Sequence, residues 1–280
     1  MSRIEKALEK ASQVRNQTPD ASQVKSEPLS RLSPDLTSGE FPFKPVTAAI
    51  SSPLLVSVTD SSSPITEEYR KLKSFLVGMA RQREFANVIM VTSALAGEGK
   101  TITTLNLALS LAQEMDHTVL LVDADLRKPM IHKYLGIEAG TGLAEVLENR
   151  GDIPDSLIHT GVGKLVVLPA GTATLNPVEL FTSQRMVKVM QEIKHRYPDR
   201  FVIIDTPPIL PFAETRTLSH LVDGVIFVIK ERLASHSRIE EALNSLEGVN
   251  KIGIVYNEAE IVVTDERYSH YYSYYQNQSV

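Results

Sequence analysis

The chain has 280 residues and a formal net charge of −5. It contains no cysteine, which excludes a disulfide framework and a cysteine nucleophile. The acidic balance gives no reason to expect nucleic-acid binding, and neither a signal peptide nor a run of about 18 apolar residues is recognisable. We therefore expect a soluble cytoplasmic protein with one α/β domain and extensions.

Residues 1–63 are rich in serine and proline, a composition that predicts a linker over most of their length. The exception is the segment 2–14, where apolar residues recur at helical spacing: Ile4, Ala7, Leu8, Ala11 and Val14. An isolated helix of this length is marginal in water, so two interpretations stay open. The segment is a frayed terminal helix, or it is a docking helix for a membrane partner or another subunit.

From residue 64 onward the pattern alternates between helices and strands. Helices are expected at 64–82 and near 100–115, 141–149, 178–196, 213–221 and 235–246. Apolar runs between them predict strands near 88–93, 118–123, 164–168, 201–205, 224–229 and 251–256. This order predicts an α/β fold with a mainly parallel sheet flanked by helices. We place this domain at 64–262 and a tyrosine-rich tail at 263–280.

The first expected strand leads into the loop Ala94–Thr101, which ends in Gly-Lys-Thr and opens a helix. Such a strand–loop–helix holds phosphate, because backbone N–H groups and the positive end of a helix face the anion. Lys100 can reach the β- and γ-phosphates, and the Thr101 hydroxyl can bind Mg²⁺. The expected nucleotide-binding residues are Ala96, Gly97, Glu98, Gly99, Lys100, Thr101 and Ile102. Because the loop begins with Ala94 where glycine is usual, a plain glycine-rich turn is the alternative.

Two further apolar runs end in aspartate, one at Asp123 with Asp125 close behind, and one at Asp205. In open α/β sheets the ligand binds beyond the carboxyl ends of the strands. We therefore expect these carboxylates to lie near Lys100 and to hold Mg²⁺ directly or through water. The alternative is that each aspartate only caps a helix or opens a turn.

The C-terminal segment holds five of the nine tyrosines of the chain: Tyr268, Tyr271, Tyr272, Tyr274 and Tyr275. Residues 265–280 contain no Leu, Ile, Phe or Met, so the segment is expected to be flexible. A flexible phenol can reach the active site of a neighbouring subunit. Phosphorylation adds roughly −1.5 to −2 charge per tyrosine, which would weaken docking at a metal–phosphate site. An inert or adhesive polar-aromatic tail is the alternative.

The phosphate loop, the motif Asp123–Arg127 (apolar-D-x-D-x-R) and the motif Asp205–Pro208 (apolar-D-x-P-P) together resemble the signature of the bacterial tyrosine kinases. That family controls polysaccharide production, and the resemblance covers roughly residues 60–280. It implies a P-loop NTPase fold like that of the MinD and ParA ATPases. Those ATPases carry a second loop lysine where this chain has Leu95, which argues against an ATP-sandwich dimer with a crossing lysine.

The resemblance implies an ATP- and Mg²⁺-dependent protein-tyrosine autokinase that phosphorylates its own tail. Lys100 would neutralise the β- and γ-phosphates. Mg²⁺ would be held by Thr101, Asp125 and Asp205, directly or through water. Asp123 or Asp125 would accept the phenol proton, and the choice between them stays open.

Three single residues need separate interpretation. Arg127 steadies the phosphates, for which arginine is well suited, or it forms a salt bridge to a nearby carboxylate. Asn257 follows the last expected strand; in related nucleotide-binding folds an asparagine here contacts the adenine edge, and a turn residue is the alternative. Glu214 stands where the resemblance leads us to expect aspartate, and its role is open.

Glu67, Arg70 and Lys73 match the family's E-x-x-R-x-x-R self-association motif, with lysine in place of the last arginine. Their spacing puts the charges near one helix face, where they could pair with a neighbouring subunit. The family implies a ring in which each tail enters the next subunit's site, although lysine lacks the planar fork of arginine. An ordinary solvated charged face is the alternative.

The resemblance also implies partners: a transmembrane activator of the polysaccharide co-polymerase type and a cognate tyrosine phosphatase. Because no membrane span is recognisable, we expect the activator to be a separate protein that holds the kinase at the inner face of the cell membrane. Two competing functions stay open. A switch ATPase would consume ATP without forming phosphotyrosine, and a nucleotide-sensing scaffold would bind nucleotide without either reaction.

Overall fold

The central strands are built from apolar runs whose side chains alternate between two cores. In β1 (Val88–Ser93) the even-numbered apolar residues face one core and the odd-numbered ones face the other. Apolar side chains also alternate between the two cores in β2 (Thr118–Asp123), β5 (Arg200–Asp205) and β6 (Gly224–Lys230). A strand buried on both faces needs a continuous apolar run, which is why these segments could be recognised as parallel strands.

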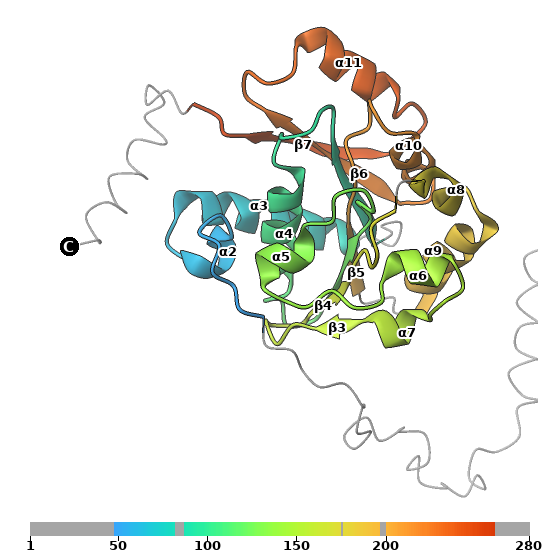
Figure 1. Ribbon diagram of the computed structural model, residues 1–280. Coiled ribbons are helices and arrows are strands. Elements are labelled where there is room, and N and C mark those ends of the chain that lie inside the picture. Colours follow the sequence, from blue (N-terminus) through green and yellow to red (C-terminus); the bar gives the residue numbers. More distant parts are fainter. Residues whose placement is uncertain (1–47, 82–86, 175, 197–199, 261–280) are drawn as a thin grey trace, which may run out of the picture. The chain divides into compact units, whose positions relative to one another are not determined.

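In the computed structural model, the described residues are 48–81, 87–174, 176–196 and 200–260. They form a seven-stranded sheet in the order β3-β4-β2-β5-β1-β6-β7 (Figure 1). Neighbouring strands are parallel throughout, including β4 (Leu165–Leu168) and β7 (Lys251–Asn257), except for the antiparallel β3 (Ile158–His159). The predicted α/β fold and its six strands are confirmed. The edge strand β3 was not predicted, because two residues are too short to show a pattern.

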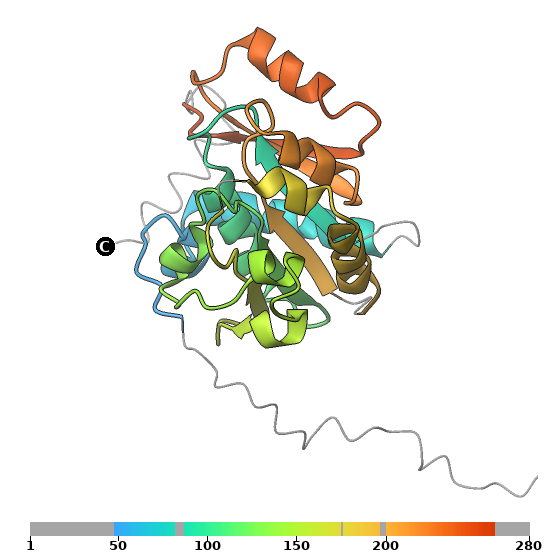
Figure 2. The same cartoon turned by 45° about the vertical axis from the view of Figure 1, so that its right-hand side comes forward.

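Helices cover both faces of the sheet (Figures 1 and 2). One face carries α2 (Val56–Thr59), α3 (Pro64–Ala80), α4 (Lys100–Leu111) and α5 (Ile131–Leu135). The other face carries α6 (Leu143–Leu147), α7 (Ile153–Ser156), α8 (Pro177–Phe181), α9 (Gln184–Arg196), α10 (Ala213–Ser219) and α11 (His236–Asn244). None of the helices described here is long and apolar enough to cross a membrane.

The helix expected at 178–196 is in fact two helices, α8 and α9. Ser183 lies between them, and its hydroxyl accepts the Met186 N–H at 3.2 Å. This is the contact of an N-cap serine, which starts a new helix rather than continuing the old one. The apolar spacing runs across the break, so periodicity alone could not show it.

The folded domain also extends further toward the N-terminus than residue 64. Leu55 is fully buried, and the Ser57 N–H and hydroxyl bond to the side chain and carbonyl of Asn106, each at 3.0 Å. Hydrogen bonds to a residue so distant in the sequence produce no apolar periodicity, so a serine-rich stretch gives no sign that it belongs to the domain. The expected helix at 2–14 and the tail at 263–280 lie outside the described residues.

Candidate active site

The phosphate loop joins β1 to α4 at the edge where the parallel strands end. Gly97 and Gly99 have left-handed backbones, with φ of 86° and 89°, a region that favours glycine. At Gly99 a Cβ would lie 2.1 Å from Nδ2 of Asn257, so that the end of this side chain would have to move to make room for it. The tight loop brings the first residues of α4, Lys100 and Thr101, to the end of β1.

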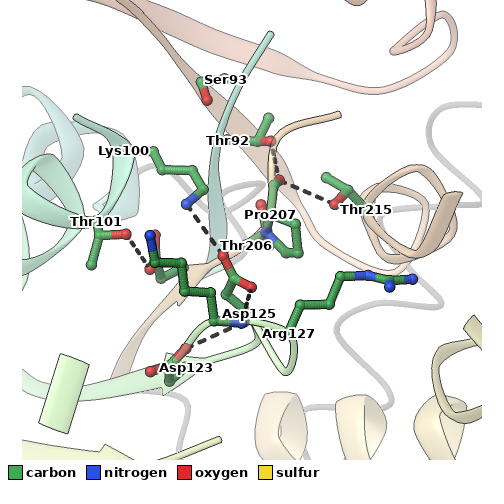
Figure 3. A network of polar contacts seen from close by, with 12 residues as sticks. Thr92, Ser93, Lys100, Thr101, Asp123, Asp125, Arg127, Thr206, Pro207 and Thr215 are labelled. Atoms are coloured by element: carbon green, nitrogen blue, oxygen red, sulfur yellow. Dashed lines mark hydrogen bonds and ion pairs between the residues drawn. The ribbon is translucent and has the colours of Figure 1, made fainter. Parts of the chain in front are cut away.

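Three carboxylates converge on this helix start. Asp123 and Asp205 are register partners at the ends of the adjacent strands β2 and β5. Lys100 Nζ lies 3.4 Å from Asp125 Oδ2, and the Thr101 hydroxyl donates to Asp205 Oδ2 at 2.8 Å (Figure 3). The structure thus brings Lys100 and Thr101 into contact with Asp125 and Asp205.

Asp205 is buried and binds a second hydroxyl, that of Thr104, which donates to its Oδ1 at 3.2 Å. Burial raises the pKa of Asp205 to about 6, although Lys100 and the Thr101 hydroxyl act to lower it. Thr104 was not among the site residues expected from the sequence. The available signal was its position three residues after Thr101, which places both hydroxyls on one face of α4.

Asp123 has no exposed surface, and both of its oxygens accept backbone hydrogen bonds. Oδ1 accepts the N–H of Asp125 and Oδ2 that of Ile131, each at 3.2 Å. Burial, and next the charge of Asp205, raise the pKa of Asp123 well above its usual range. Asp123 therefore shapes the loop that follows β2, whereas Asp125, at 8% exposed, retains a surface open to a ligand.

The oxygen donors at this edge fit Mg²⁺, a hard cation that prefers carboxylate and hydroxyl ligands. The raised pKa of Asp205 marks a carboxylate whose charge a divalent cation would stabilise. In the part of the chain that the structure describes, no group of three or more acidic or histidine side chains is arranged to hold a metal. Mg²⁺ is commonly bound by one or two carboxylates together with substrate phosphates and water.

Arg127 extends away from Lys100 in Figure 3 and lies against α10. Its Nε donates to Glu214 Oε1 at 2.5 Å, and its guanidinium stands 4.8 Å from the centre of the Phe212 ring. The structure therefore shows the salt bridge, the second of the two interpretations of this residue. It also places Glu214, which is 1% exposed, as the partner carboxylate.

Asn257 is the last residue of β7, and its Nδ2 donates to the carbonyl of Glu98 at 3.0 Å. The side chain predicted to contact the adenine edge thus contacts the phosphate loop itself. Of the remaining loop residues, Ala96 is exposed, Glu98 is fully buried, and Ile102 packs against the core beneath α4.

The charged motif on α3 is paired within the subunit. Arg70 Nη1 lies 3.1 Å from Glu67 Oε2, and its Nη2 donates to the Ser61 carbonyl at 3.0 Å. Lys73 Nζ lies 2.7 Å from Glu114 Oε1. A contact of these residues with another subunit would have to exchange or extend these pairs.

The described chain ends at Glu260, three residues after β7. Because β7 is parallel to β6, it finishes at the same edge as the phosphate loop, where Asn257 makes its contact. The last described residues, which precede the tyrosine-rich segment in the sequence, therefore follow a strand that ends at the edge of the sheet that holds the candidate site.

Comparison with known proteins identifies close relatives. Residues 86–258 match the AAA domain family. The chain is 34% identical over 192 residues to the tyrosine-protein kinase YwqD of Bacillus subtilis, a match that covers 69% of this chain and 79% of that protein. It is 32% identical over 188 residues to the tyrosine-protein kinase CpsD of Streptococcus agalactiae, with coverages of 66% and 81%.

Solved structures agree with the sequence relatives. The kinase domain of the Escherichia coli tyrosine kinase ETK matches with a TM-score of 0.67 and 28% identity, over 74% of this chain and 82% of that one. The septum site-determining protein MinD of Pyrococcus horikoshii, solved with Mg-ADP, matches with a TM-score of 0.54 and 23% identity, over 63% and 73%. The second likeness concerns the fold alone, and it confirms the predicted P-loop architecture.

Proposed function

Because this chain belongs to the family of bacterial tyrosine-protein kinases, we propose that it transfers the γ-phosphoryl group of ATP to tyrosines of its own C-terminal segment. The observation that carries the proposal is the meeting of a phosphate loop, Lys100 and three carboxylates at the edge where β7 ends. The acceptors would be Tyr268, Tyr271, Tyr272, Tyr274 and Tyr275.

In this mechanism the loop N–H groups and Lys100 bind the β- and γ-phosphates of ATP. Thr101 and Asp205 would hold Mg²⁺ directly or through water, and Asp125 would hold it through water; the cation neutralises phosphate charge when bound. The phenol oxygen bonds to the γ-phosphorus while the bond from that phosphorus to the bridging oxygen breaks, so that ADP leaves. Positioning and electrostatics supply most of the catalysis in such transfers.

A free tyrosine has a pKa of about 10, so the attack needs a base. We assign Asp125 to this role rather than Asp123. Both oxygens of Asp123 accept backbone N–H groups inside the protein, whereas Asp125 has exposed surface beside Lys100. The phenol proton would pass to the Asp125 carboxylate as the new bond to phosphorus forms.

We further infer that transfer occurs in trans within a ring, and that Glu67, Arg70 and Lys73 contribute to the contact between subunits. A transmembrane activator would hold the kinase at the inner face of the cell membrane, and a cognate phosphatase would reverse the modification. The cycle would regulate polymerisation and export of an exopolysaccharide. These statements rest on the family resemblance, and the position where β7 ends supports access of the tail to an active site.

The test is intact-mass spectrometry of the full chain after incubation with ATP and Mg²⁺, beside Lys100→Met and a variant with all five tail tyrosines replaced by phenylalanine. Successive phosphate additions in the wild type alone would support the autokinase. ATP consumption without phosphate addition would favour the switch ATPase. Nucleotide binding with neither reaction, repeated in the presence of the activator, would favour the scaffold.

A mixed sample separates trans from cis transfer. Lys100→Met keeps its tail tyrosines, and the phenylalanine variant keeps its active site, so each lacks what the other supplies. Phosphate on the Lys100→Met chain after mixing would establish trans transfer. If neither chain is modified although the wild type modifies itself, the transfer is intramolecular.

A further inference from the structure

The phosphate loop contains one buried carboxylate that the proposed reaction does not use. Glu98 has no exposed surface, and its Oε2 accepts the Leu95 N–H at 2.7 Å. Its other oxygen, Oε1, is buried and has no hydrogen-bond partner among the described residues. A carboxylate buried with so few partners is unfavourable, and a negative charge is unexpected in a loop that binds anions.

Glu98 makes two hydrogen bonds that hold the loop in place, one through its side chain and one through its backbone carbonyl. The bond from Leu95 to the Glu98 carboxylate closes the first turn of the loop, which the Ser93 hydroxyl also holds by donating to the Leu95 carbonyl at 2.8 Å. The Glu98 carbonyl accepts Nδ2 of Asn257 at 3.0 Å, which fixes the next peptide against the end of β7. Glycines flank Glu98 on both sides, and glycine is the residue with the greatest backbone freedom.

We propose that Glu98 is a positioning residue, which holds the phosphate loop in its binding shape before the nucleotide arrives. Without the hydrogen bond to the Glu98 side chain, the loop would have to lose more of the freedom of Gly97 and Gly99 when phosphate binds, and affinity would fall. Because the Leu95 N–H is taken up by Glu98, the phosphates are bound by the N–H groups that follow in the loop. The inference rests on the proposed nucleotide-binding function.

Three variants of the full chain distinguish two properties of the Glu98 side chain: the length that lets it accept the Leu95 N–H, and its charge. Glu98→Gln keeps the reach and one acceptor oxygen, Glu98→Asp keeps the charge but is one methylene shorter, and Glu98→Ala removes both. Loss of this hydrogen bond should raise the Kd for Mg·ATP about tenfold in the Asp and Ala variants, with Gln within about threefold of wild type. The effect should be larger on the Kd for Mg·ATP than on the rate at saturating ATP, because the proposed role of Glu98 is to shape the loop and not to act on the reacting atoms.

A local measurement without nucleotide keeps the inference independent of catalysis. Hydrogen exchange of the Leu95 amide, followed by NMR in protein labelled with ¹⁵N-leucine, should be about tenfold faster in the Asp and Ala variants. The Gln variant should retain the protection of the wild type. A residue with a merely structural role would instead speed exchange across the core and lower the melting temperature.

Two outcomes would overturn the inference. One is wild-type affinity and wild-type Leu95 exchange in the Asp and Ala variants. The other is a Gln variant as weak as the Ala variant, because charge rather than reach would then matter. If the wild type itself failed to bind Mg·ATP, the proposed function would fail, while the exchange of Leu95 would still judge the role of Glu98.

Discussion

The phosphate loop (94–99) and the carboxylate cluster (Asp123, Asp125 and Asp205) meet at one edge of the sheet, yet they are built differently. The shape of the loop is set mainly by its backbone. Two glycines have left-handed conformations, the Glu98 carbonyl accepts a hydrogen bond from Asn257, and the Leu95 N–H donates to the Glu98 carboxylate. The cluster is shaped by side-chain oxygens that accept hydroxyl and N–H groups. The loop should therefore be sensitive to added volume, and the cluster to charge and protonation.

The largest expected effect is in the loop, for Gly99→Ala. The new Cβ would lie 2.1 Å from Nδ2 of Asn257, so that Asn257 must move and its bond to Glu98 must break. We expect the Kd for Mg·ATP, measured by calorimetry, to rise by about 100-fold or more, the loss of two or more hydrogen bonds in a shaped site. Gly99→Ala combined with Asn257→Ala should recover part of the loss.

Gly248→Ala is the matched control for this substitution. Gly248 also has a positive φ, of 76°, but a Cβ there meets nothing within 4 Å. Both variants should lose about 1–2 kcal/mol of stability from the left-handed backbone. If Gly248→Ala weakened nucleotide binding as much as Gly99→Ala, strain rather than the contact with Asn257 would be the cause.

The next effect concerns the loop after β2, for Arg127→Ala. This change leaves Glu214 buried without its cation, and its Oε2 already has no partner among the described residues. Removing the cation beside a buried carboxylate should cost about 2–3 kcal/mol here, because Arg127 itself is 31% exposed, and urea unfolding would measure this loss. Arg127→Ala with Glu214→Gln should restore most of that stability, since the unpaired charge is gone.

The same variant decides between the two interpretations of Arg127. A salt bridge predicts lower stability with a KM for ATP within about twofold of wild type, whereas a phosphate contact predicts a raised KM at unchanged stability. Lys71→Ala is the control, because Lys71 pairs with Glu68 on the surface. That substitution should leave stability nearly unchanged.

The sequence predicted those features of the site that depend on local patterns. The buried strands could be recognised from unbroken apolar runs, and Asp123 and Asp205 from their place at the ends of two such runs. Contacts between distant residues could not be predicted. Arg127 and Glu214, or Glu98 and Asn257, meet only because the sheet order brings their loops together.

The boundary of the domain shows the same limit. Ser57 and Leu55 lie in a stretch whose composition predicts a linker, but hydrogen bonds to Asn106 and burial against α4 make them part of the fold. Composition reports what a segment can bury by itself. It does not show that the side chain of the buried Asn106, on a neighbouring helix, accepts a hydrogen bond from the backbone of that segment and donates another to it.

The smallest effect, and the one that sharpens the contrast between loop and cluster, is expected for Asp205→Asn without nucleotide or metal. The pKa of Asp205 in the folded protein is about 6, above that of an unfolded aspartate, so its ionisation destabilises the fold. This penalty is absent below the unfolded pKa, near 4, and is complete above pH 6. Removing the charge should therefore stabilise the protein at pH 8 by roughly 2 kcal/mol, after loss of some hydrogen bonding to Thr101 and Thr104.

Urea unfolding in EDTA at pH 8 and pH 5 would measure this gain, which should fall to roughly a third at pH 5. Asp123 acts in the same direction, because the charge of Asp205 helps to raise the pKa of Asp123, so that removing this charge also relieves Asp123 and adds to the gain at high pH. The exposed Asp152→Asn is the control, with no such gain expected. Mg·ATP should reverse the order of stability, because it stabilises the wild type through the Asp205 carboxylate. A gain that is equal at pH 8 and pH 5 would show that packing, not ionisation, distinguishes the carboxylate cluster from the phosphate loop.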